Sequence, residues 1–586
     1  MEQRLKKAER VCDLLVIGSG AAGLTAAITA ASKGFKVIVL EKSDYVGGAT
    51  AWSGGWIWLP KSAHKTRQTV RSDTEQAEHY LKHVLGSDAD QAKIKAYLDS
   101  APALEELLLE HTPVRFQQDV SIPDYYATAA GYSESGRSRV VAPMKGHMLG
   151  DDIQRLRKPM PHLTIAGLMP SAGPEMRHFF NAGRSFRSSL YVFRRLLRHG
   201  IEWLTTGRSL TLTNGNALAG GLFKAALDLG VEVMTGMQAR SLIWENEKVS
   251  GATIDIGLKT VKIYASNGVV LACGGFPANT YRRKQFYHHT RSGEEHWSVA
   301  PSVCNGDGLT LGEAVGAKVD GFGGNGGAWV PVSMVPQPNG HVAPFPHFAD
   351  RAKPGLIAVR KDGKRFTNEA APYFQFMQSL FKATKPNEDP VAWLICDHAF
   401  QRRYGLGFSK PSPIPIRKYL SSGYLVSGQT LHELAEKCGI NTEAFCRTVS
   451  RYNKAASRGH DPMFRRGSEP VNRAQGDPSI KPNPCVSPLL KPPYYAVKIL
   501  PGCLGSFAGL KTDAKARVLD QSDSPISGLF ACGSDMASMM SGHYPAGGIS
   551  LGPALVFGYL AGCSSSGGVS SNDKTSNIKK DFHAYL

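Results

Sequence analysis

The chain contains 586 residues with a formal net charge of +19; 42% of the residues are hydrophobic and 20% are charged. These values are typical of a globular protein, and the length predicts two domains plus an insertion. No apolar run is long enough to span a bilayer, and the ten cysteines form no C-x-x-C pair, so we expect neither a metal site nor a disulfide framework. The positive charge has no nucleic-acid motif beside it, which argues against a nucleic-acid partner. Residues 1–10 are charged and leave no room for a secretory signal, so we expect a cytoplasmic protein.

The first motif along the chain combines a buried strand, a glycine-rich turn and the start of a helix. Leu14–Ile17 and Val37–Leu40 are apolar runs typical of neighbouring parallel strands. The residues that match the dinucleotide-binding fingerprint are Gly18, Ser19, Gly20, Ala21, Ala22 and Gly23, followed by the acid Glu41. In this fingerprint the first glycine permits a tight turn, the second permits close approach of a pyrophosphate, and the helix N-terminus attracts the phosphates. We therefore predict a bound dinucleotide with its ribose hydroxyls on the acid.

A second glycine-rich loop follows directly after this acid and indicates which dinucleotide is bound. Its small residues suit close backbone contact with a diphosphate and a flavin ring, whereas a nicotinamide enzyme usually continues with another strand and helix. We therefore predict FAD, and because residues 47–55 contain no histidine we expect it to be bound non-covalently. The cofactor-binding residues predicted here are Lys42, Gly47, Gly48, Ala49, Thr50, Ser53 and Gly54.

A basic amphipathic helix is predicted between residues 184 and 204. Its apolar residues recur every three or four positions and form one face, made of Phe186, Leu190, Phe193, Leu197, Ile201 and Leu204. The basic residues off this face are Arg184, Arg187, Arg194, Arg195 and Arg198. Two interpretations are open: the apolar face lies in a membrane interface with the arginines on anionic headgroups, or it packs on the protein's own core. We favour peripheral association with the cytoplasmic face of a membrane.

The cofactor domain is predicted to be split along the chain. A helix start near Asn214, a strand at 231–234 and a hairpin over 238–265 lead to a strand and glycine turn at 268–276. We predict an α/β fold in which a Rossmann-like FAD-binding domain, split in sequence, contains an inserted α+β substrate domain, with the substrate cleft at their junction. The expected boundaries are 1–283 for the first part of the FAD-binding domain, with the basic insertion at about 174–210, then 284–494 for the substrate domain, 495–562 for the second part and 563–586 for a mobile tail.

Four further motifs carry a resemblance to a known family. They are Pro123-Asp124-Tyr125-Tyr126, Gly274-Gly275-Phe276, Asn368-Glu369-Ala370-Ala371-Pro372-Tyr373 and Tyr544-Pro545-Ala546-Gly547-Gly548. Together with the N-terminal fingerprint they resemble the FAD-dependent 3-ketosteroid Δ1-dehydrogenases, which are relatives of the fumarate reductase flavoproteins. The resemblance covers nearly the whole chain outside the basic insertion. Some longer members of that family carry an insertion near residues 170–210 that is thought to touch the membrane.

The resemblance implies a reaction and a set of catalytic residues. Oxidation of the carbon 1–carbon 2 bond of a 3-ketosteroid removes a proton from carbon 2 and a hydride from carbon 1, which passes to flavin N5. The Tyr544 hydroxyl and the backbone N–H of Gly548 are the implied donors to the 3-keto oxygen. Tyr373 is the implied base, with Tyr125 assisting, because a hydrogen bond from a second tyrosine would favour the tyrosinate. Tyr126 is the alternative to Tyr125, since adjacent residues of an extended segment point to opposite faces.

The same resemblance implies further cofactor contacts, at Ala239, Gly274, Gly533, Ser534, Gly548, Ser550 and Leu551. Two positions depart from the family pattern. His543 stands where relatives often have a small hydroxyl residue, and it would either tune the neighbouring tyrosine or face the rim of the site. Ala546 stands where the related Δ4-(5α)-dehydrogenases typically carry a serine, which favours Δ1 oxidation.

Three alternative functions are open. A Δ4-(5α or 5β)-dehydrogenase would use the same scaffold, whereas an enoate reductase of the fumarate reductase type would need convergent arginine and histidine residues. The third is a non-catalytic flavin-binding membrane protein. No second nucleotide fingerprint is present, so we expect a quinone or another acceptor to reoxidise the flavin.

Overall fold

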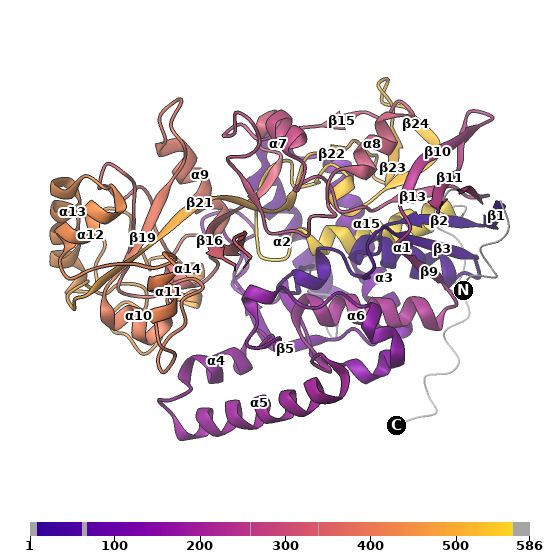
Figure 1. The fold of residues 1–586 in the computed structure, drawn as a ribbon. Helices are drawn as coiled ribbons and strands as arrows, with labels where there is room; N and C mark the ends of the chain where they lie inside the picture. The colour runs from indigo at the N-terminus through magenta and orange to yellow at the C-terminus, as the bar shows by residue number, and fades with distance from the viewer. Residues whose placement is uncertain (1–8, 61–66, 258, 338, 567–586) are drawn as a thin grey trace.

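A six-stranded sheet forms the centre of the larger region of the computed structural model, which describes residues 9–60, 67–257, 259–337 and 339–566 (Figure 1). In order across the sheet, its strands are β23 (Arg517–Leu519), β24 (Pro525–Ala531), β13 (Val269–Leu271), β2 (Leu14–Ile17), β3 (Val37–Glu41) and β9 (Glu232–Thr235). All neighbours are parallel except β23 and β24. Three separate parts of the chain thus meet in one sheet, which confirms the predicted split α/β fold.

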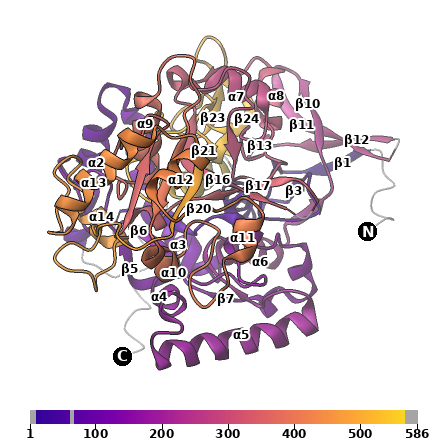
Figure 2. The ribbon, with the colours of Figure 1, turned by 60° about the vertical axis from the view of Figure 1, so that its left-hand side comes forward.

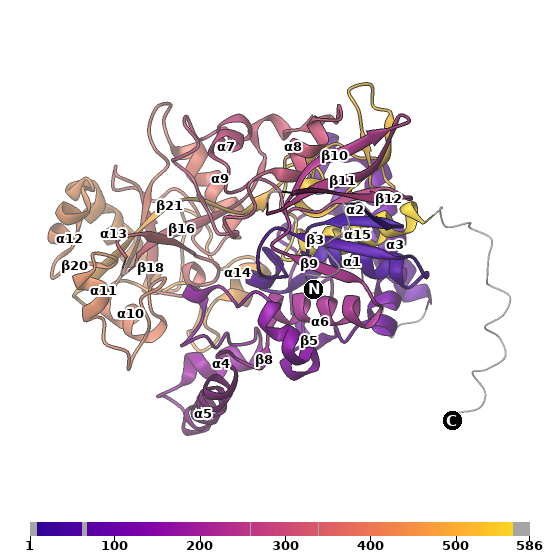
Figure 3. The same cartoon turned by 45° about the vertical axis from the view of Figure 1, so that its right-hand side comes forward.

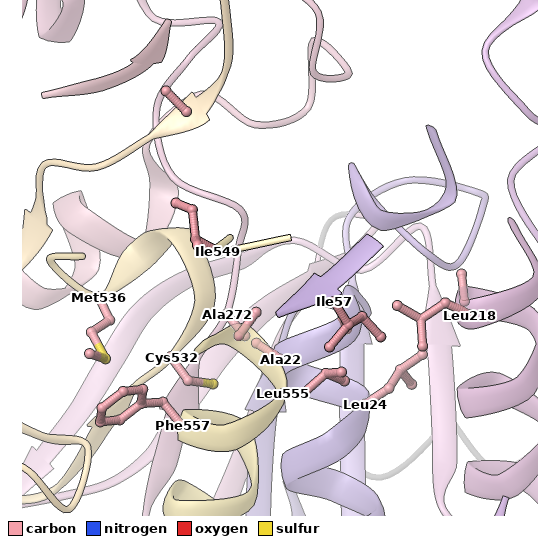
Figure 4. Close-up of a cluster of buried hydrophobic side chains, with 14 of the residues drawn as sticks. Ala22, Leu24, Ile57, Leu218, Ala272, Cys532, Met536, Ile549, Leu555 and Phe557 are labelled. Atoms are coloured by element: carbon pink, nitrogen blue, oxygen red, sulfur yellow. The ribbon is translucent and has the colours of Figure 1, made fainter. Parts of the chain in front are cut away.

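Small residues let the helices of this region pack closely. α1 (Ala21–Ala31) lies beside α15 (Leu551–Ser565), and a Cβ on Gly558 would lie only 2.4 Å from the carbonyl oxygen of Ala22. Figure 4 shows Ala22 and Leu24 of α1 close to Leu555 of α15. The other helices of the region are α2 (Arg67–Leu85), α3 (Gln91–His111), α6 (Asn214–Asp228), α7 (Thr280–Phe286) and α8 (Asp307–Glu313).

Smaller sheets surround this core. The predicted hairpin is confirmed and forms a four-stranded sheet, in the order β1 (Glu9–Cys12), β12 (Lys259–Ala265), β11 (Lys248–Ile256) and β10 (Ala239–Glu245). A three-stranded sheet joins β4 (Trp56–Trp58), β6 (Ser138–Val141) and β5 (Phe116–Ile122). The remaining two-stranded pairs are β7 (Met144–Lys145) with β8 (Thr211–Leu212), and β15 (Val319–Asp320) with β22 (Gly509–Leu510).

A second region, at the left of Figure 1, is built on a seven-stranded sheet. Its main path is β17 (Val342–Pro346), β16 (Gly327–Pro336), β21 (Tyr494–Ser506), β19 (Ala392–Cys396) and β18 (Leu356–Val359), while β14 (Trp297–Ser298) and β20 (Val426–Gly428) also pair with β21. The helices are α9 (Tyr373–Ala383), α10 (His398–Tyr404), α11 (Arg417–Ser421), α12 (Leu431–Cys438), α13 (Thr442–Ala456) and α14 (Pro470–Gln475). This region is the predicted α+β insertion.

The structure bears on two of the expected domain boundaries. Because β21 pairs along its length with strands of the second sheet, we propose that the second part of the FAD-binding domain begins after Ser506 rather than at residue 495. The expected mobile tail, 563–586, begins inside α15, which continues to Ser565. The rest of that tail, from residue 567, lies outside the described residues.

The predicted basic helix forms, and it stands at the edge of the molecule. α4 (Pro174–Asn181) and α5 (Phe186–Thr206) make a hairpin that lies apart from both large sheets in all three views (Figures 1, 2 and 3). The apolar face of α5 points to solvent: Phe193 is 63% exposed and Leu204 is 87% exposed. The opposite side is buried and polar, with the His199 ring 2.9 Å from the carbonyl of Ala166. The apolar face of α5 therefore does not pack on the protein's own core, which excludes the second of the two interpretations.

Not all of the arginines on this hairpin are available to an outside partner. Arg195 pairs with Glu175 of α4 at 3.0 Å, and both side chains are nearly buried. The interpretation of Arg195 as a headgroup contact is therefore wrong, since it holds α5 against α4. No helix in the described parts of the chain is both long and apolar enough to cross a membrane.

Candidate functional site

One continuous cavity of about 580 Å³ runs between the two large sheets. The part lined by the N-terminal fingerprint and Glu41 is called the cofactor end, and the part lined by Tyr125, Tyr373 and Tyr544 is called the tyrosine end. Residues of β21 and of the loop after β24 line the stretch where the two ends meet. The predicted cleft at the junction of the two regions is thus present.

The cofactor end is a cradle of backbone. Gly20 has an ordinary φ of −74°, and a Cβ placed there would meet only the Thr50 hydroxyl, at 3.7 Å. Neither its own conformation nor its neighbours require glycine, so the open space above Gly20 fits a ligand that approaches the backbone. Gly18 differs, because its φ is +111° and a Cβ would collide with the carbonyl of Ala272. The cradle therefore fits the pyrophosphate of FAD at the start of α1.

Glu41 is held ready at the carboxyl end of β3. One carboxylate oxygen accepts the Ser19 hydroxyl at 2.6 Å, and the other accepts the Ser43 backbone N–H at 2.9 Å. Next to it, Lys42 forms an ion pair with Asp307 at 2.6 Å. These contacts orient the carboxylate toward the cavity, where it can accept the two ribose hydroxyls of the adenosine.

Nearly all the predicted cofactor residues line the cavity. The exceptions are Gly23 and Gly47, whose role is to let neighbouring chain segments approach. A Cβ on Gly23 would lie 2.1 Å from the carbonyl of Gly18, and one on Gly47 would lie 3.1 Å from the methyl group of Ala219. Both residues therefore contribute to the cofactor end indirectly, by allowing close packing of the segments that line it.

Asp535 supports the cofactor end from inside the protein. Its carboxylate is fully buried and accepts the backbone N–H groups of Cys273 and Gly275, the latter at 2.9 Å. Burial raises the pKa of Asp535 to about 6, although these two bonds oppose the effect. The sequence pattern gave no role to this side chain, which ties the glycine turn after β13 to the turn after β24.

Three tyrosines from distant parts of the chain meet at the tyrosine end. The Tyr373 hydroxyl donates a hydrogen bond to the Tyr544 hydroxyl at 2.7 Å. The Tyr125 ring is stacked beside Tyr544 with 6.0 Å between ring centres, and it meets Tyr373 edge-on at 6.2 Å. The structure thus brings together all three side chains that the resemblance pointed to.

Burial affects the protonation of all three tyrosines. Burial raises the pKa of Tyr125, Tyr373 and Tyr544, and for Tyr373 the two neighbouring tyrosines raise it further. Burial therefore opposes the tyrosinate form that a base at Tyr373 requires.

Gly548 places a free donor beside these tyrosines. Its φ is +94°, and its backbone N–H has no acceptor among the described residues. The peptide group that carries this N–H is fixed at its other end, since the Ser138 hydroxyl donates to the carbonyl of Gly547 at 2.7 Å. An N–H that is rigid, unpaired and at a cavity wall is suited to stabilise an oxyanion.

Tyr126 and His543, which are adjacent in sequence to Tyr125 and Tyr544, do not face the cavity. Tyr125 lines the cavity, whereas Tyr126 does not, and its backbone N–H is held by the hydroxyl of Tyr80 at 3.3 Å. His543 lies at the surface with its ring 3.4 Å from the carboxylate of Asp88. The structure therefore places His543 at the rim rather than against Tyr544.

Large apolar side chains that the sequence analysis did not single out form the walls of the tyrosine end. They are Trp52, Ile122, Leu163, Phe348 and Leu504. The ring of Phe348 meets that of Tyr373 at 5.4 Å. No local sequence signal distinguishes these residues from other core residues, because they come from five separate segments.

The chain matches known flavoproteins over most of its length. Residues 13–551 match the family described as FAD binding domain. A 4-oxocyclohex-2-ene-1-carboxylate 5-dehydrogenase from Sinomonas cyclohexanicum is 36% identical over 564 residues, which cover 96% of this chain and 95% of that protein. A 3-oxosteroid 1-dehydrogenase from Mycobacterium tuberculosis is 34% identical over 562 residues, covering 94% and 97% of the two chains.

A solved structure is also similar throughout. The 3-ketosteroid Δ1-dehydrogenase from Sterolibacterium denitrificans, in complex with 1,4-androstadiene-3,17-dione, aligns with a TM-score of 0.87 at 32% identity. The alignment covers 95% of this chain and 100% of that chain. All three relatives are dehydrogenases by name.

Proposed function

We propose that this chain, which belongs to the FAD binding domain family and is an FAD-dependent dehydrogenase, introduces the carbon 1–carbon 2 double bond into ring A of 3-ketosteroids. The observation that carries the proposal is the hydrogen-bonded pair Tyr373 and Tyr544 beside the free N–H of Gly548. A ring ketone placed at this point would receive two donors on its oxygen. The 3-oxosteroid dehydrogenases among the relatives support the same substrate class.

The residues of the chain act on the ketone and on one proton. Tyr544 and the N–H of Gly548 donate to the 3-keto oxygen and stabilise the negative charge that develops there. This stabilisation acidifies the proton on carbon 2, which Tyr373 accepts with assistance from Tyr125. Bound FAD supplies the acceptor for the hydride of carbon 1. The apolar walls exclude water from the reacting carbons.

A cyclohexene carboxylate is the competing substrate class, because the relative from Sinomonas cyclohexanicum is named for one. A carboxylate in an apolar cavity needs a cationic or hydrogen-bonding partner. Lys42 is the one cationic side chain among the described residues that line the cavity, and it is paired with Asp307 at the cofactor end. The walls of the tyrosine end therefore suit a steroid better than a small anion. The same lack of arginine and histidine argues against a fumarate-type enoate reductase.

Anaerobic mixing of the purified yellow protein with each substrate is the test. Androst-4-ene-3,17-dione should bleach the flavin and yield the 1,4-diene, whereas 4-oxocyclohex-2-ene-1-carboxylate should leave the flavin oxidised. Bleaching by the carboxylate alone would assign the chain to the other substrate class. No bleaching by any ring ketone would favour the non-catalytic alternative.

The position of the new double bond has its own test. Ala546 is buried and offers no hydroxyl for proton relay, which supports Δ1 over Δ4 oxidation. With 5α-androstane-3,17-dione the product should be the 1-ene. Formation of androst-4-ene-3,17-dione from this saturated substrate would identify a Δ4-(5α)-dehydrogenase instead.

We also propose that FAD is held non-covalently. No histidine is found among the described residues that line the cavity. Acid precipitation should therefore release the flavin into the supernatant. Flavin that stays on the protein pellet would show a covalent link.

A further proposal is that α5 binds the surface of a membrane that contains anionic lipids. Its exposed apolar face has no protein partner in the described structure. Beside this face lies a hollow of about 430 Å³ whose lining includes Lys145, Arg194 and Arg198, the apolar Leu197 and Ile201, and the acid Glu202. Arg198 is paired with Glu202 at 2.9 Å but keeps 66% of its side chain exposed, and Arg194 and Lys145 add further positive charge. Apolar side chains next to arginines suit the boundary between acyl chains and anionic headgroups. Contact with a membrane would also bring the protein close to its sterol substrate and to a quinone acceptor.

Vesicle flotation tests this membrane proposal. Wild-type protein should float with phosphatidylglycerol vesicles at low salt, and the double variant Arg194→Glu/Arg198→Glu should not. The matched control is Arg447→Glu/Arg451→Glu, which makes the same change in charge on exposed positions of α13. Equal flotation of the two double variants would contradict a role for α5.

A further inference from the structure

Tyr125 lies in an irregular segment, residues 123–137 between β5 and β6, that forms neither helix nor strand. Its own backbone N–H donates to the carbonyl of Pro545 at 2.9 Å. The residue before it is anchored, because the carboxylate of Asp124 accepts the Trp58 indole N–H at 2.8 Å and an Arg137 guanidinium N–H at 3.0 Å. The position of Tyr125 therefore also depends on what anchors the residue after it.

That second anchor is the hydroxyl of Tyr80, a tyrosine of α2. Its side chain is 0% exposed and does not line the cavity. The hydroxyl accepts the backbone N–H of Tyr126 at 3.3 Å and donates to the carbonyl of Pro545 at 2.6 Å. Burial raises the pKa of Tyr80, so the hydroxyl keeps the proton that it donates. Since Pro545 follows Tyr544 directly, one hydroxyl bridges the segments that carry two of the three tyrosines of the site.

The two sides of this bridge do not depend on it equally. On the Tyr544 side, the Ser138 hydroxyl holds the carbonyl of Gly547, and the Trp58 backbone N–H donates to the carbonyl of Gly548 at 3.3 Å. These bonds remain when the Tyr80 hydroxyl is removed. On the other side, the N–H of Tyr126 would lose its acceptor, and an unpaired N–H away from water is costly enough to displace the segment. Tyr80 therefore controls mainly the segment that carries Tyr125.

A displacement of this segment would act on the reacting cluster. The Tyr125 ring lies 6.0 Å from that of Tyr544 and 6.2 Å from that of Tyr373. There is little spare room around its hydroxyl, since a Cβ added to Gly547 would lie only 3.4 Å away from it. Proton transfer between side chains needs heavy atoms within about 2.6–3.2 Å of each other, so a small movement of the backbone is enough to separate them.

We propose that Tyr80 is a positioning residue for proton abstraction: its hydroxyl joins the Tyr126 N–H to the Pro545 carbonyl and thereby keeps the Tyr125 hydroxyl within reach of Tyr373. This inference rests on the proposed function. Tyr80 lies outside the cavity and exchanges no proton with the steroid. It acts on the step in which Tyr373 accepts the proton of carbon 2, and not on binding of the steroid by the apolar walls.

Anaerobic flavin reduction by androst-4-ene-3,17-dione, followed by rapid mixing, tests this role. Tyr80→Phe keeps the ring and removes only the bridge. The reduction rate at saturating steroid should fall by about tenfold, because slight misplacement of a catalytic group is costly, whereas the steroid concentration for half-maximal rate should change by less than about twofold. The control is Tyr452→Phe in α13, a buried tyrosine outside the cavity lining whose hydroxyl donates to the Ser487 carbonyl at 3.2 Å; both values should stay at wild type.

A double-mutant cycle shows whether Tyr80 acts through Tyr125. Tyr125→Phe removes the hydroxyl that the bridge positions, so adding Tyr80→Phe to this variant should lower the rate by less than about twofold. A tenfold loss in both backgrounds would show that Tyr80 only supports the fold, and it would overturn the proposal. A wild-type rate in Tyr80→Phe would overturn it as well. FAD content and thermal midpoint of each variant report folding separately from the rate.

Failure of this inference differs from failure of the proposed function. If wild-type protein is not reduced by the steroid, the proposed function fails and this inference fails with it. If wild-type protein is reduced and Tyr80→Phe is reduced equally fast, only the role of Tyr80 is wrong.

Discussion

The two ends of the cavity are built in different ways. The cofactor end consists mainly of backbone and small residues from continuous stretches, such as the fingerprint at the start of α1. The tyrosine end consists of side chains, and its three tyrosines come from segments that are more than a hundred residues apart in the sequence. The chemistry explains this difference, because a pyrophosphate is bound by N–H groups that every residue has, whereas a ketone needs particular donors at particular points. A site made of backbone tolerates many side chains, and a site made of side chains does not.

The largest expected effect is at the tyrosine end. Tyr544→Phe removes one aimed donor without changing the ring, and such a loss typically lowers turnover by about 10² to 10³. FAD content should stay normal, because the hydroxyl lies outside the cofactor end. Steady-state kinetics on androst-4-ene-3,17-dione and the flavin absorbance of the purified variant are the measurements. Tyr126→Phe is the control, since that side chain does not line the cavity. A similar loss there would mean that the effect at Tyr544 is not specific to a donor in the cavity, and loss of FAD from Tyr544→Phe would mean that the two ends are not separable.

A smaller effect is expected at the cofactor end, where FAD affinity rather than turnover should fall. Gly20→Ala adds a methyl group where the structure has open space, so the apoprotein should fold normally, but FAD affinity should fall by about ten- to hundredfold. Titration of FAD into apoprotein measures this, and turnover at saturating FAD should remain close to wild type. Gly18→Ala provides the contrast, because its Cβ would collide with backbone and should impair folding itself. Tight FAD binding by Gly20→Ala would contradict the backbone cradle.

The smallest effect is expected at the rim between the site and solvent. His543→Gln should change turnover by less than about twofold, because the ring points to Asp88 at the surface and not to Tyr544. Its pH profile should also match that of wild type. A loss comparable to that of Tyr544→Phe would mean that His543 belongs to the reacting cluster.

The sequence was sufficient for features with a local pattern. The strands and helix around Gly20 follow from apolar runs and glycine spacing, and α5 follows from a period of three to four residues. The tyrosine cluster could be reached only through the family motifs, since nothing local shows that Tyr125 faces the cavity while Tyr126 does not. Phe348 was missed because its role depends on packing between segments that the sequence does not show to be neighbours.

The protonation of the cluster could not be predicted either. The proximity of two tyrosines suggests an easily ionised base, but the structure shows that both are buried, and burial acts in the opposite direction. How strongly burial acts depends on the depth of the site, and only the folded chain shows that depth. The outward orientation of α5 is a similar case, because periodicity identifies an apolar face without showing what covers it.

The outward apolar face of α5 also affects how the protein behaves after purification. Phe186 and Leu204, near the two ends of the helix, are both more than four-fifths exposed at 85% and 87%. Contiguous apolar surface of this kind promotes contact between copies when no other apolar phase is present. In detergent-free buffer we therefore expect the elution volume in size-exclusion chromatography to decrease as the loaded concentration increases. A mild detergent that covers α5 should remove this dependence without affecting the flavin.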